Sequence, residues 1–410
     1  MTKVAFFKKS FLYSAILVFL TMPALLPRAY AMGNFGGQKQ VGEQQGKKEI
    51  KAGQIRALIY HHFGREDTYP STSVSVEQFE KHLAYLKKND YTVLTLGQAL
   101  DRLYGKAALA EKTAVLTIDD GYRSVWENAR PLLDKYGFAA TLFISTGNVG
   151  GSNYLTWEEI QKLENQGFEI GNHSHSHTYF LNKPKDQIAE AFEKDLKKAD
   201  EQFRKHLGRV PDLYAYPFGE YTPEMMEVLK AHGYRAAAAQ RSGVIHGCSS
   251  RYALPRFPMN YSYGDMEGFS NKMGMNALAV LEAQPESPLL AKNSPPRLTL
   301  RIDEKNINPD GLQCFVNGRG ACDMKKKWRN GGLILTVRAT ERLTDRRNLY
   351  TITAPSTDGS RWHWYSHLWV IPQPPPPPPP HPPPPPSSPP PPPPPPLPLP
   401  PPPPSSPPPP

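Results

Sequence analysis

The sequence predicts an α/β fold for its main domain, a parallel sheet flanked by helices over residues 55–290, closed as a barrel or open. The first observation behind this prediction is that short apolar runs alternate with helical patterns along this region. The second is a change after residue 290, where strand-like runs follow one another without a helix. That change predicts a small, sandwich-like β domain over residues 291–371. In a parallel sheet of either kind, functional residues are expected at the carboxyl ends of strands.

The first 54 residues are predicted to lie outside the folded domain. Lysines 8 and 9 precede an apolar run too short for an ordinary membrane span, and alanines at 29 and 31 suit a cleavage site. Residues 1–31 are therefore predicted to be a signal peptide, with an uncleaved anchor as the alternative. The protein is expected to be exported, to a periplasmic, cell-surface or extracellular place. Residues 32–54 are rich in Gly, Gln and Lys and are predicted to be a flexible linker.

The elements of the α/β domain follow from period and boundary residues. Buried strands are expected at RALIYH, YTVLTL, TAVLTI, AATLFIS, FEIGN and LYAYPF. Helices are expected from Ser75, through VWENARPLLDKYG to its stopping Gly137, through TWEEIQKLENQG, from about Pro184 to Leu207, and after the capping Thr222. The β domain is expected to contain strands at LTLRI, GLILTVRA and LYTITA. Residues 372–410 are almost entirely proline and are predicted to form an extended polyproline tail.

Charge is distributed unevenly along the chain. Of the net charge of +10, residues 1–31 contribute +4, residues 32–54 contribute +2 and residues 293–371 contribute +6, which leaves residues 55–292 at −2. A near-neutral main domain and predicted export argue against a nucleic-acid partner. The basic β domain suits an anionic cell-envelope polymer, or is an ordinary solvated surface. The proline tail is a second candidate for envelope contact.

The three cysteines fit an oxidising compartment. Cys314 and Cys322 bracket a glycine-rich loop and are predicted to form a disulfide that staples a hairpin, and Cys248 is left over. The chain has no CxxC motif and no zinc-finger spacing.

Two carboxylates end one of the predicted strands. In LTIDDGY, Asp119 and Asp120 follow an apolar run and precede a glycine. Asp-Asp-Gly alone is an ordinary turn. At the carboxyl end of a strand, however, adjacent aspartates point in different directions, so one can bind a metal while the other takes a proton from water.

GNHSHSH follows another apolar strand and places histidines at 173, 175 and 177. As a strand this tract would put all three on one face, whereas in a helical turn His173 and His177 share a face and His175 points away. Two imidazoles and one carboxylate leave an open position, as hydrolytic zinc requires. The same ligand types serve non-haem iron, although nothing further in the sequence favours oxygen chemistry.

A third candidate segment, YAYPFGEY, contains Tyr216, Pro217 and Phe218 between a strand and a helix start. A backbone amide of this turn is a candidate oxyanion donor, and its aromatic ring a candidate pocket wall. A Pro-aromatic-Gly turn is weak evidence by itself.

In this order on a β/α chain, TIDDG, HSxxH and YPFG resemble the motifs of the polysaccharide deacetylases with the NodB homology domain, carbohydrate esterase family 4. RALIYHHF, ATLFIS, LTWEEI and LPRFPMN add to the resemblance, which covers roughly residues 55–290. The details are most similar to the branch that deacetylates poly-β-1,6-N-acetylglucosamine. The resemblance implies a distorted (β/α) barrel.

The resemblance also implies roles for individual residues. Asp119 would be the general base, Asp120, His173 and His177 the ligands of a divalent metal ion, with zinc favoured, and His175 would lie outside that set. Ser174 would orient the loop. Tyr216, Pro217 and Phe218 would serve the substrate and its oxyanion.

Two positions depart from the family pattern. Where the family carries an arginine that steadies the catalytic aspartate, this chain has Ala215, and Arg256 of LPRF is the predicted substitute. For the late histidine that protonates the leaving amine, His246 is a weak candidate because its surroundings match poorly.

The sequence thus predicts metal-dependent hydrolysis of N-acetyl groups from a GlcNAc-containing polysaccharide. The alternatives are a deacetylase of another acetylated glycan, such as peptidoglycan or xylan, and a catalytically silent polysaccharide-binding protein. Asp119, Asp120, His173 and His177 together argue against the silent binder.

Overall fold

The computed structural model describes residues 53–290, 295–318, 320, 322–329 and 332–373. The predicted signal peptide, nearly all of the predicted linker and the proline run from residue 374 lie outside the described residues. Within the described residues, no helix is both long enough and apolar enough to cross a membrane.

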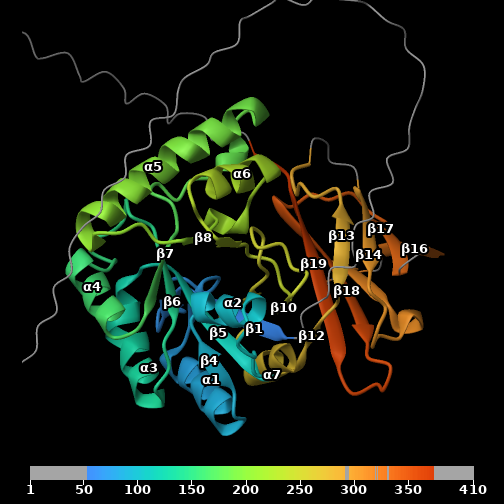
Figure 1. Cartoon of the computed structure of the whole chain (residues 1–410), viewed down its shortest axis with the longest axis horizontal. Coiled ribbons are helices and arrows are strands. Elements are labelled where there is room, and N and C mark those ends of the chain that lie inside the picture. The colour runs from blue at the N-terminus through green and yellow to red at the C-terminus, as the bar shows by residue number, and fades with distance from the viewer. Residues whose placement is uncertain (1–52, 291–294, 319, 321, 330–331, 374–410) are drawn as a thin grey trace, which may run out of the picture. The chain divides into compact units, whose positions relative to one another are not determined.

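The α/β domain alternates strands and helices (Figure 1). Its elements in chain order are β1 (Gln54–Tyr60), β2 (His62–Phe63), β3 (Ser73–Val74), α1 (Val76–Lys88), β4 (Thr92–Leu94), α2 (Leu96–Tyr104), β5 (Thr113–Asp120), the π-helix η1 (Val125–Ala129), α3 (Arg130–Tyr136), β6 (Thr141–Ile144), α4 (Trp157–Asn165), β7 (Glu169–Asn172), the 3₁₀ helices η2 (Phe180–Asn182) and η3 (Lys185–Gln187), α5 (Ile188–Leu207), β8 (Leu213–Ala215), the 3₁₀ helix η4 (Pro217–Gly219), α6 (Pro223–Ala231), β9 (Ala236–Ala238), β10 (Ile245–His246), β11 (Phe257–Pro258) and α7 (Met266–Gly274).

Strands β2 and β3 pair with each other, and the other nine form one sheet in the order β10-β1-β5-β6-β7-β8-β9, with β11 paired to β1 and β4 paired to β5. All the ladders are parallel except that between β1 and β10. At the seam between β9 and β1, Leu254 bridges to Ala238, and Phe257 pairs with Leu58. The sheet is therefore a distorted barrel whose seam is spanned by a short chain segment. The parallel order places the carboxyl ends of β5, β7 and β8 at one edge.

Helix boundaries follow the predicted capping residues. Ser75 accepts a hydrogen bond from the backbone of Gln78 at the start of α1, and Thr222 caps α6 in the same way through Met225. Gly137 ends α3 with φ of 68°, a left-handed conformation that glycine adopts at low cost. The expected helix starts after Ser75 and Thr222 and the expected helix end at Gly137 are confirmed.

Helix α2 was not expected, because its first residue was assigned to the strand YTVLTL. Thr95 ends that strand early by forming a capping box with Gln98, in which each side chain accepts a hydrogen bond from the other residue's backbone N–H. The apolar residues after Thr95 then line a helical face instead of a strand.

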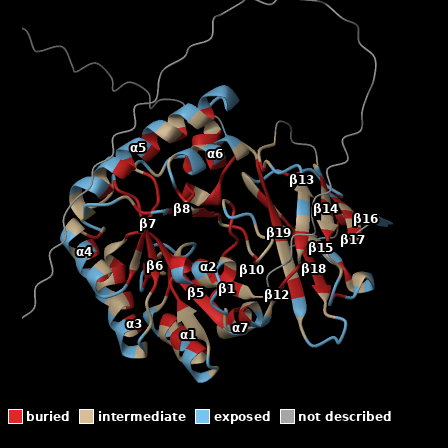
Figure 2. Ribbon diagram, viewed as in Figure 1, coloured by how far each residue is buried: buried red, intermediate tan, exposed pale blue. Residues whose placement is uncertain are grey.

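The barrel core is apolar and consists of three clusters of buried residues between the sheet and its helices, and the buried strands are seen in Figure 2. The residues of β5 are all buried, which matches a strand covered on both faces. This close packing fixes the positions of the strand ends and so of the side chains at the edge of the sheet.

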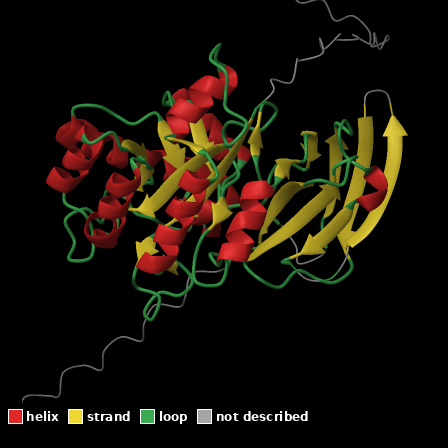
Figure 3. Ribbon diagram, turned by 90° about the horizontal axis from the view of Figure 1, so that it is seen from below, coloured by secondary structure: helices red, strands yellow, loops and turns green. Residues whose placement is uncertain are grey.

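A β-sandwich follows the barrel, and Figure 3 shows that it is built of strands and loops with one short helical turn. Its elements are β12 (Asn276–Ala277), β13 (Val280–Gln284), β14 (Arg297–Ile302), the 3₁₀ turn η5 (Pro309–Gly311), β15 (Gln313–Val316), β16 (Cys322–Arg329), β17 (Gly332–Ala339), β18 (Arg347–Pro355) and β19 (Trp362–Val370). The two sheets have the orders β12-β19-β18-β15 and β13-β14-β17-β16. Strands β12 and β13 belong to these sheets, so the sandwich begins before residue 291, the expected boundary.

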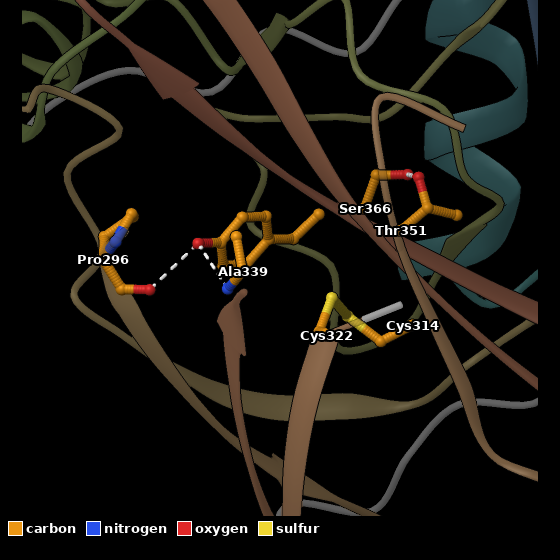
Figure 4. The surroundings of a disulfide bond; sticks show 7 residues. Pro296, Cys314, Cys322, Ala339, Thr351 and Ser366 are labelled. Carbon is orange, nitrogen blue, oxygen red and sulfur yellow. Dashed lines mark hydrogen bonds between the residues drawn. A yellow bond between two sulfur atoms is a disulfide. The ribbon is translucent and has the colours of Figure 1, made fainter. Parts of the chain in front are cut away.

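The predicted disulfide between Cys314 and Cys322 is present (Figure 4). It does not staple a hairpin, however, because Cys314 lies on β15 and Cys322 on β16, which belong to different sheets. The bond therefore links the two layers of the sandwich at the edge strand β16. Nearby, Tyr350 Oη donates to the carbonyl of Pro296 and accepts from the amide of Ala339 (Figure 4).

The basic charge of this domain collects on the outer face of one sheet. Strands β14, β17 and β16 are in register so that their apolar residues alternate inward, and the opposite side presents Arg297, Arg301, Arg338, Lys325, Lys327 and Arg329. Glu282 and Asp323 are the carboxylates that this face also carries. The expected envelope contact of this domain stays a prediction.

Candidate active site

One row of residues crosses the sheet at the edge where β5, β6, β7 and β8 end. Asp120 pairs with Ile144, Ile144 with Asn172, and Asn172 with Tyr214. The residues just after this row therefore meet above the sheet. In this way the DDG turn and the histidine tract, more than 50 residues apart in the chain, come to the same place.

Asp120, His173 and His177 form a compact group in which one ligand atom of each lies within 4.8 Å of the others. The Nε2 atoms of His173 and His177 lie 3.2 and 3.1 Å from Oδ1 of Asp120. His175 is not part of this group, and its Nδ1 lies 3.0 Å from Oγ1 of Thr146. Of the two arrangements considered for GNHSHSH, all three histidines on one face or the pair at 173 and 177, the structure has the pair.

The loop after β7 is held in an unusual conformation. Ser174 and His177 have φ angles of 72° and 47°, in the left-handed region that residues with a side chain rarely adopt. Ser174 Oγ accepts a hydrogen bond from the backbone N–H of His177, and both carboxylate oxygens of Asp195 accept from the backbone of His175 and Ser176. These bonds turn both imidazoles of the pair toward Asp120.

A backbone carbonyl sets the tautomer of His173. Its Nδ1–H donates to the carbonyl of Ala215 over 2.7 Å, so Nε2 presents a lone pair toward Asp120. Burial alone would lower the pKa of His173, but the carboxylates of Asp119 and Asp120 outweigh burial and raise it. The position that carries an arginine in the family motif therefore contributes its carbonyl here.

The arrangement fits a divalent metal ion. Asp120 Oδ1 is buried and, despite the two nearby imidazole nitrogens, has no hydrogen bond of acceptable geometry. Burial would raise the pKa of Asp120, but His173, His177 and His61 hold it well below its usual value, so the group is a carboxylate. A buried, charged oxygen without a hydrogen-bond donor, beside two imidazole nitrogens, is a donor set that suits zinc.

Arg256 pairs with the second aspartate. Its Nη1 and Nη2 donate to the two carboxylate oxygens of Asp119 over 2.7 and 2.9 Å, a bidentate pair that is fully buried. Nη1 also donates to Oγ1 of Thr117. Burial would raise the pKa of Asp119, but Arg256 and then His173 lower it, so this carboxylate stays ionised. Arg256 occupies the place predicted for it beside the aspartate.

The turn after β8 presents a backbone amide. Phe218 has φ of 58° and ψ of 6°, and the N–H groups of Gly219 and Glu220 are already bonded to Tyr216 and Pro217 carbonyls. Among the described residues, the Phe218 N–H donates no hydrogen bond to a backbone carbonyl outside its own turn. A side chain at Gly219 would come within 2.2 Å of the backbone nitrogen of Gln240, so only glycine fits there.

Tyr216 does not belong to the site, contrary to expectation. Its ring is fully buried, its hydroxyl donates to the carbonyl of Tyr252, and its N–H donates to the carbonyl of Ala238. Strand parity explains the difference, because Tyr216 points into the apolar cluster under α5 and α6.

His246 is also wrongly placed to protonate a leaving group. It pairs with Gln54 at the amino end of β1, whereas Asp119 lies beyond the residues that pair at the carboxyl end of the same strand. Six residues of strand separate the two ends, which is about 20 Å. Burial lowers the pKa of His246 to about 4.

His61 is the site residue that sequence reasoning missed. It directly follows β1, and Tyr60 pairs with Ile118, so His61 comes level with Asp119. Burial lowers the pKa of His61, and Asp120 and Asp119 oppose that effect, which places all three in one electrostatic group. The signal was present in YHHF, because a histidine directly after a buried strand matches the position of His173 after β7.

Aromatic rings flank the site on two sides. His62 stacks on Tyr122 and Tyr69, with ring centroids 3.6 and 4.5 Å apart. On the histidine-loop side, Tyr179 stacks on Phe218 at 3.6 Å. Tyr69 is 43% exposed, so it is available for stacking against a flat apolar ligand face, whereas Tyr179, at 39%, has Phe218 stacked on its ring and the Arg346 guanidinium 4.1 Å from its ring centroid.

Comparison with known proteins gives a family match. Residues 106–237 match the family model described as polysaccharide deacetylase. The chain is 30% identical over 217 residues to the poly-β-1,6-N-acetyl-D-glucosamine N-deacetylase of Staphylococcus aureus (strain MRSA252), an alignment that covers 50% of this chain and 74% of that protein. The solved structure of a de-N-acetylase from Aggregatibacter actinomycetemcomitans aligns with a TM-score of 0.50 at 18% identity, over 54% of this chain and 100% of that one. The expected distorted barrel of the NodB type is confirmed.

Proposed function

Because this chain belongs to the polysaccharide deacetylase family, we propose that it hydrolyses the N-acetyl groups of a GlcNAc-containing polysaccharide and releases acetate. The observation that carries the proposal is the meeting of two distinct groups at one sheet edge. One is the buried Asp119–Arg256 pair, and the other is the cluster of Asp120, His173 and His177. A hydrolase of an amide needs both a base and an electrophile, and these two groups fit those roles.

Asp120, His173 and His177 would hold the metal ion, with zinc favoured by the two imidazoles and one carboxylate. When bound, the ion supplies Lewis acidity toward the acetamide oxygen and lowers the pKa of a water molecule. The chain's part is to fix the ligands, through the Ala215 carbonyl on His173 and through Ser174 behind His177.

Two proton transfers are assigned to protein side chains. Asp119 accepts a proton from the water whose oxygen attacks the acetyl carbon, and Arg256 keeps this carboxylate ionised and oriented. The C–N bond then breaks, and the nitrogen takes a proton from the imidazolium form of His61, which Asp119 and Asp120 favour; acetate, a free amine and a neutral His61 remain. His61 receives the role because it stands level with Asp119 at the end of β1.

Other groups at this edge suit the remaining demands. The N–H of Phe218 is a donor for the oxygen on which negative charge develops. Tyr69 would stack against a sugar ring on one side, and the exposed edge of Tyr179 would line the other side. A cavity of about 540 Å³, lined by Ser176, Thr178, Lys183 and lysines of α5, borders the histidine loop and gives a polymer room to continue.

The GlcNAc assignment draws on the named activity of the Staphylococcus aureus relative. Deacetylation of peptidoglycan or xylan remains the enzymatic alternative, because the residues described act on the acetyl group and not on the sugar. A silent binder would need neither the Asp119–Arg256 pair nor an unpartnered Asp120 oxygen. An envelope polysaccharide also suits the export predicted from residues 1–31.

The test is acetate release from a panel of acetylated glycans, using metal-stripped protein reconstituted with zinc. We expect release from β-1,6-linked N-acetylglucosamine oligomers, and a loss of roughly 10²–10⁴-fold in Asp119→Asn at unchanged metal content. Release from xylan or peptidoglycan fragments alone would reassign the substrate. Bound metal without release from any glycan would favour the binding protein.

A further inference from the structure

An arginine of the sandwich reaches the loops of the candidate site. Arg346 directly precedes β18, and its Nε and Nη2 donate to Oε1 and Oε2 of Glu220 over 2.9 and 2.7 Å. Its Nη1 donates to Oδ1 of Asn182 over 2.6 Å. All three guanidinium nitrogens are thus used, in a planar fork that a lysine cannot reproduce.

The two acceptors belong to the two loops that flank the site. Glu220 directly follows the η4 turn that presents the Phe218 N–H, and Asn182 ends η2, a few residues after His177. Glu220 is only 3% exposed, so its carboxylate depends on a cation brought from another part of the chain. Arg346 therefore ties the turn and the histidine loop to one point.

The same guanidinium extends a stack of rings that ends at a candidate metal ligand. The Arg346 guanidinium carbon lies 4.1 Å from the ring centroid of Tyr179, and Tyr179 stacks on Phe218 at 3.6 Å and 11°. The two contacts are too close to share one face, so Tyr179 is held between them. Phe218 in turn packs its ring against His177, with centroids 4.6 Å apart.

The residues in this stack need support from outside their own loops. Phe218 and His177 both have positive φ angles, a conformation that persists only where the surroundings hold it. The next residue of the sandwich, Arg347, donates from Nη2 to the carbonyl of Gln240, whose backbone lies against Gly219. Consecutive arginines of β18 and its approach thus brace both sides of the turn.

We propose that Arg346 is a positioning residue of the deacetylase site, through which the sandwich sets the Phe218 amide and His177. The proposal rests on the proposed function for its catalytic readout, but its metal-binding readout is independent of activity. It makes the sandwich a structural part of the site and not only an attached module.

The experiment compares Arg346→Met, Arg346→Lys and the double variant Arg346→Met/Glu220→Gln, with Arg301→Met as the control. Arg301 is an arginine of the same domain that pairs with one half-exposed carboxylate, Glu282, on the outer sheet face. Affinity for Co²⁺ is measured by the visible absorption of the bound ion, and kcat and KM are measured by acetate release. The double variant removes the buried charge of Glu220 and so separates lost positioning from lost folding.

We expect Arg346→Met and the double variant to bind Co²⁺ about 10- to 100-fold more weakly, and to lose kcat by a similar factor with a smaller change in KM. Arg346→Lys should fall between these and wild type, and Arg301→Met should match wild type. Wild-type Co²⁺ affinity and kcat in the folded double variant would overturn the proposal, because Arg346 would then only neutralise Glu220. If wild type binds Co²⁺ but releases no acetate, the proposed function fails while the Co²⁺ titrations still decide the role of Arg346.

Discussion

The carboxyl and amino edges of the barrel sheet differ in how far their polar groups are hydrogen-bonded. At the carboxyl edge, Asp120, Ser174, His177 and Phe218 all have positive φ angles, and a buried carboxylate oxygen lacks a hydrogen bond. At the amino edge, Glu169 accepts hydrogen bonds from Thr141 and from the amide of Gly97. At the amino edge the Glu169 carboxylate is used in hydrogen bonds, whereas the carboxyl edge keeps positive φ angles and a buried carboxylate oxygen without a hydrogen bond.

The difference shows which edge of the sheet can hold a reactive site. Strained residues persist only if their surroundings hold them, and the apolar core beneath both edges gives that support. The amino edge uses its polar residues for stability, whereas the carboxyl edge leaves them available to a ligand. The substitutions below lie at one of the two edges or away from both, and their effects test whether reactivity is confined to the carboxyl edge.

The largest effect is expected from Arg256 at the carboxyl edge. Arg256→Met leaves Asp119 as an unpaired buried carboxylate, so the free energy of unfolding should fall by about 3–5 kcal/mol, and turnover should be crippled while metal content is kept. Urea unfolding, acetate release and metal analysis of the folded variant check this.

The matched control at the amino edge is Arg235→Met. Its close partners Asp101 and Asp212 are exposed, and Glu169, 3.9 Å away, keeps its hydrogen bonds from Thr141 and Gly97. Its cost should be no more than about 1 kcal/mol, with normal turnover. Unchanged turnover in Arg256→Met would contradict the role given to Arg256, and a large loss in Arg235→Met would contradict the division between the edges.

The next effect compares the histidines at the two ends of β1. His61→Asn should lower kcat by roughly 100-fold because it removes the proposed proton donor, and His246→Asn should leave kcat near wild type. Acetate release with saturating substrate measures both. The reverse order of effects would return the acid role to His246.

A smaller effect concerns His82, a buried histidine away from both edges. Its Nδ1 lies 3.1 Å from Tyr60 Oη and its Nε2 lies 2.7 Å from the carbonyl of Gly264, and burial lowers its pKa from 6.5 to about 4. Between pH 6.5 and about pH 4, the His82 imidazole is protonated in the unfolded chain but stays neutral in the folded protein. The stability that neutral His82 contributes is therefore complete above pH 6.5 and is lost as the pH falls toward 4.

His82→Gln keeps a donor and an acceptor but does not titrate. Between pH 7 and pH 5, wild type should lose roughly 2 kcal/mol more unfolding free energy than this variant, as measured by urea unfolding. Equal losses in the two proteins would show that His82 is not kept neutral on folding.

The smallest effect is expected on the outer sheet face of the sandwich. Lys325→Gln/Lys327→Gln should weaken binding to inorganic polyphosphate by about 1 kcal/mol per charge at low salt. Turnover should stay normal, because neither residue approaches the site. Binding equal to wild type would remove this face as an envelope contact.

Local signals predicted much of the fold. Capping residues such as Ser75 and Thr222 act within one helical turn, so their effect is visible in a short window of sequence. Thr95 shows the limit of this approach, because an apolar run continues across its capping box and hides the change from strand to helix.

The candidate site was predictable where a motif holds all its parts close together. The spacing of the HSxxH motif selected His173 and His177, and the loop geometry brings that pair to Asp120. Arg256 could be predicted only because it lies in LPRFPMN, a segment that resembles the family sequence. Arg346 could not be predicted at all, since its contacts with Glu220 and Asn182 join segments more than 120 residues apart.

The seam of the barrel has a consequence for the order in which activity is acquired during synthesis. Arg256 lies on the segment that joins β9 to β1, 137 residues after its partner Asp119. Until that segment closes the seam, Asp119 has no countercharge and the core cannot cover it without cost. A nascent or clipped chain that ends before the seam thus holds Asp120, His173 and His177 but leaves Asp119 without its arginine, so we expect the proposed activity only once the barrel is complete.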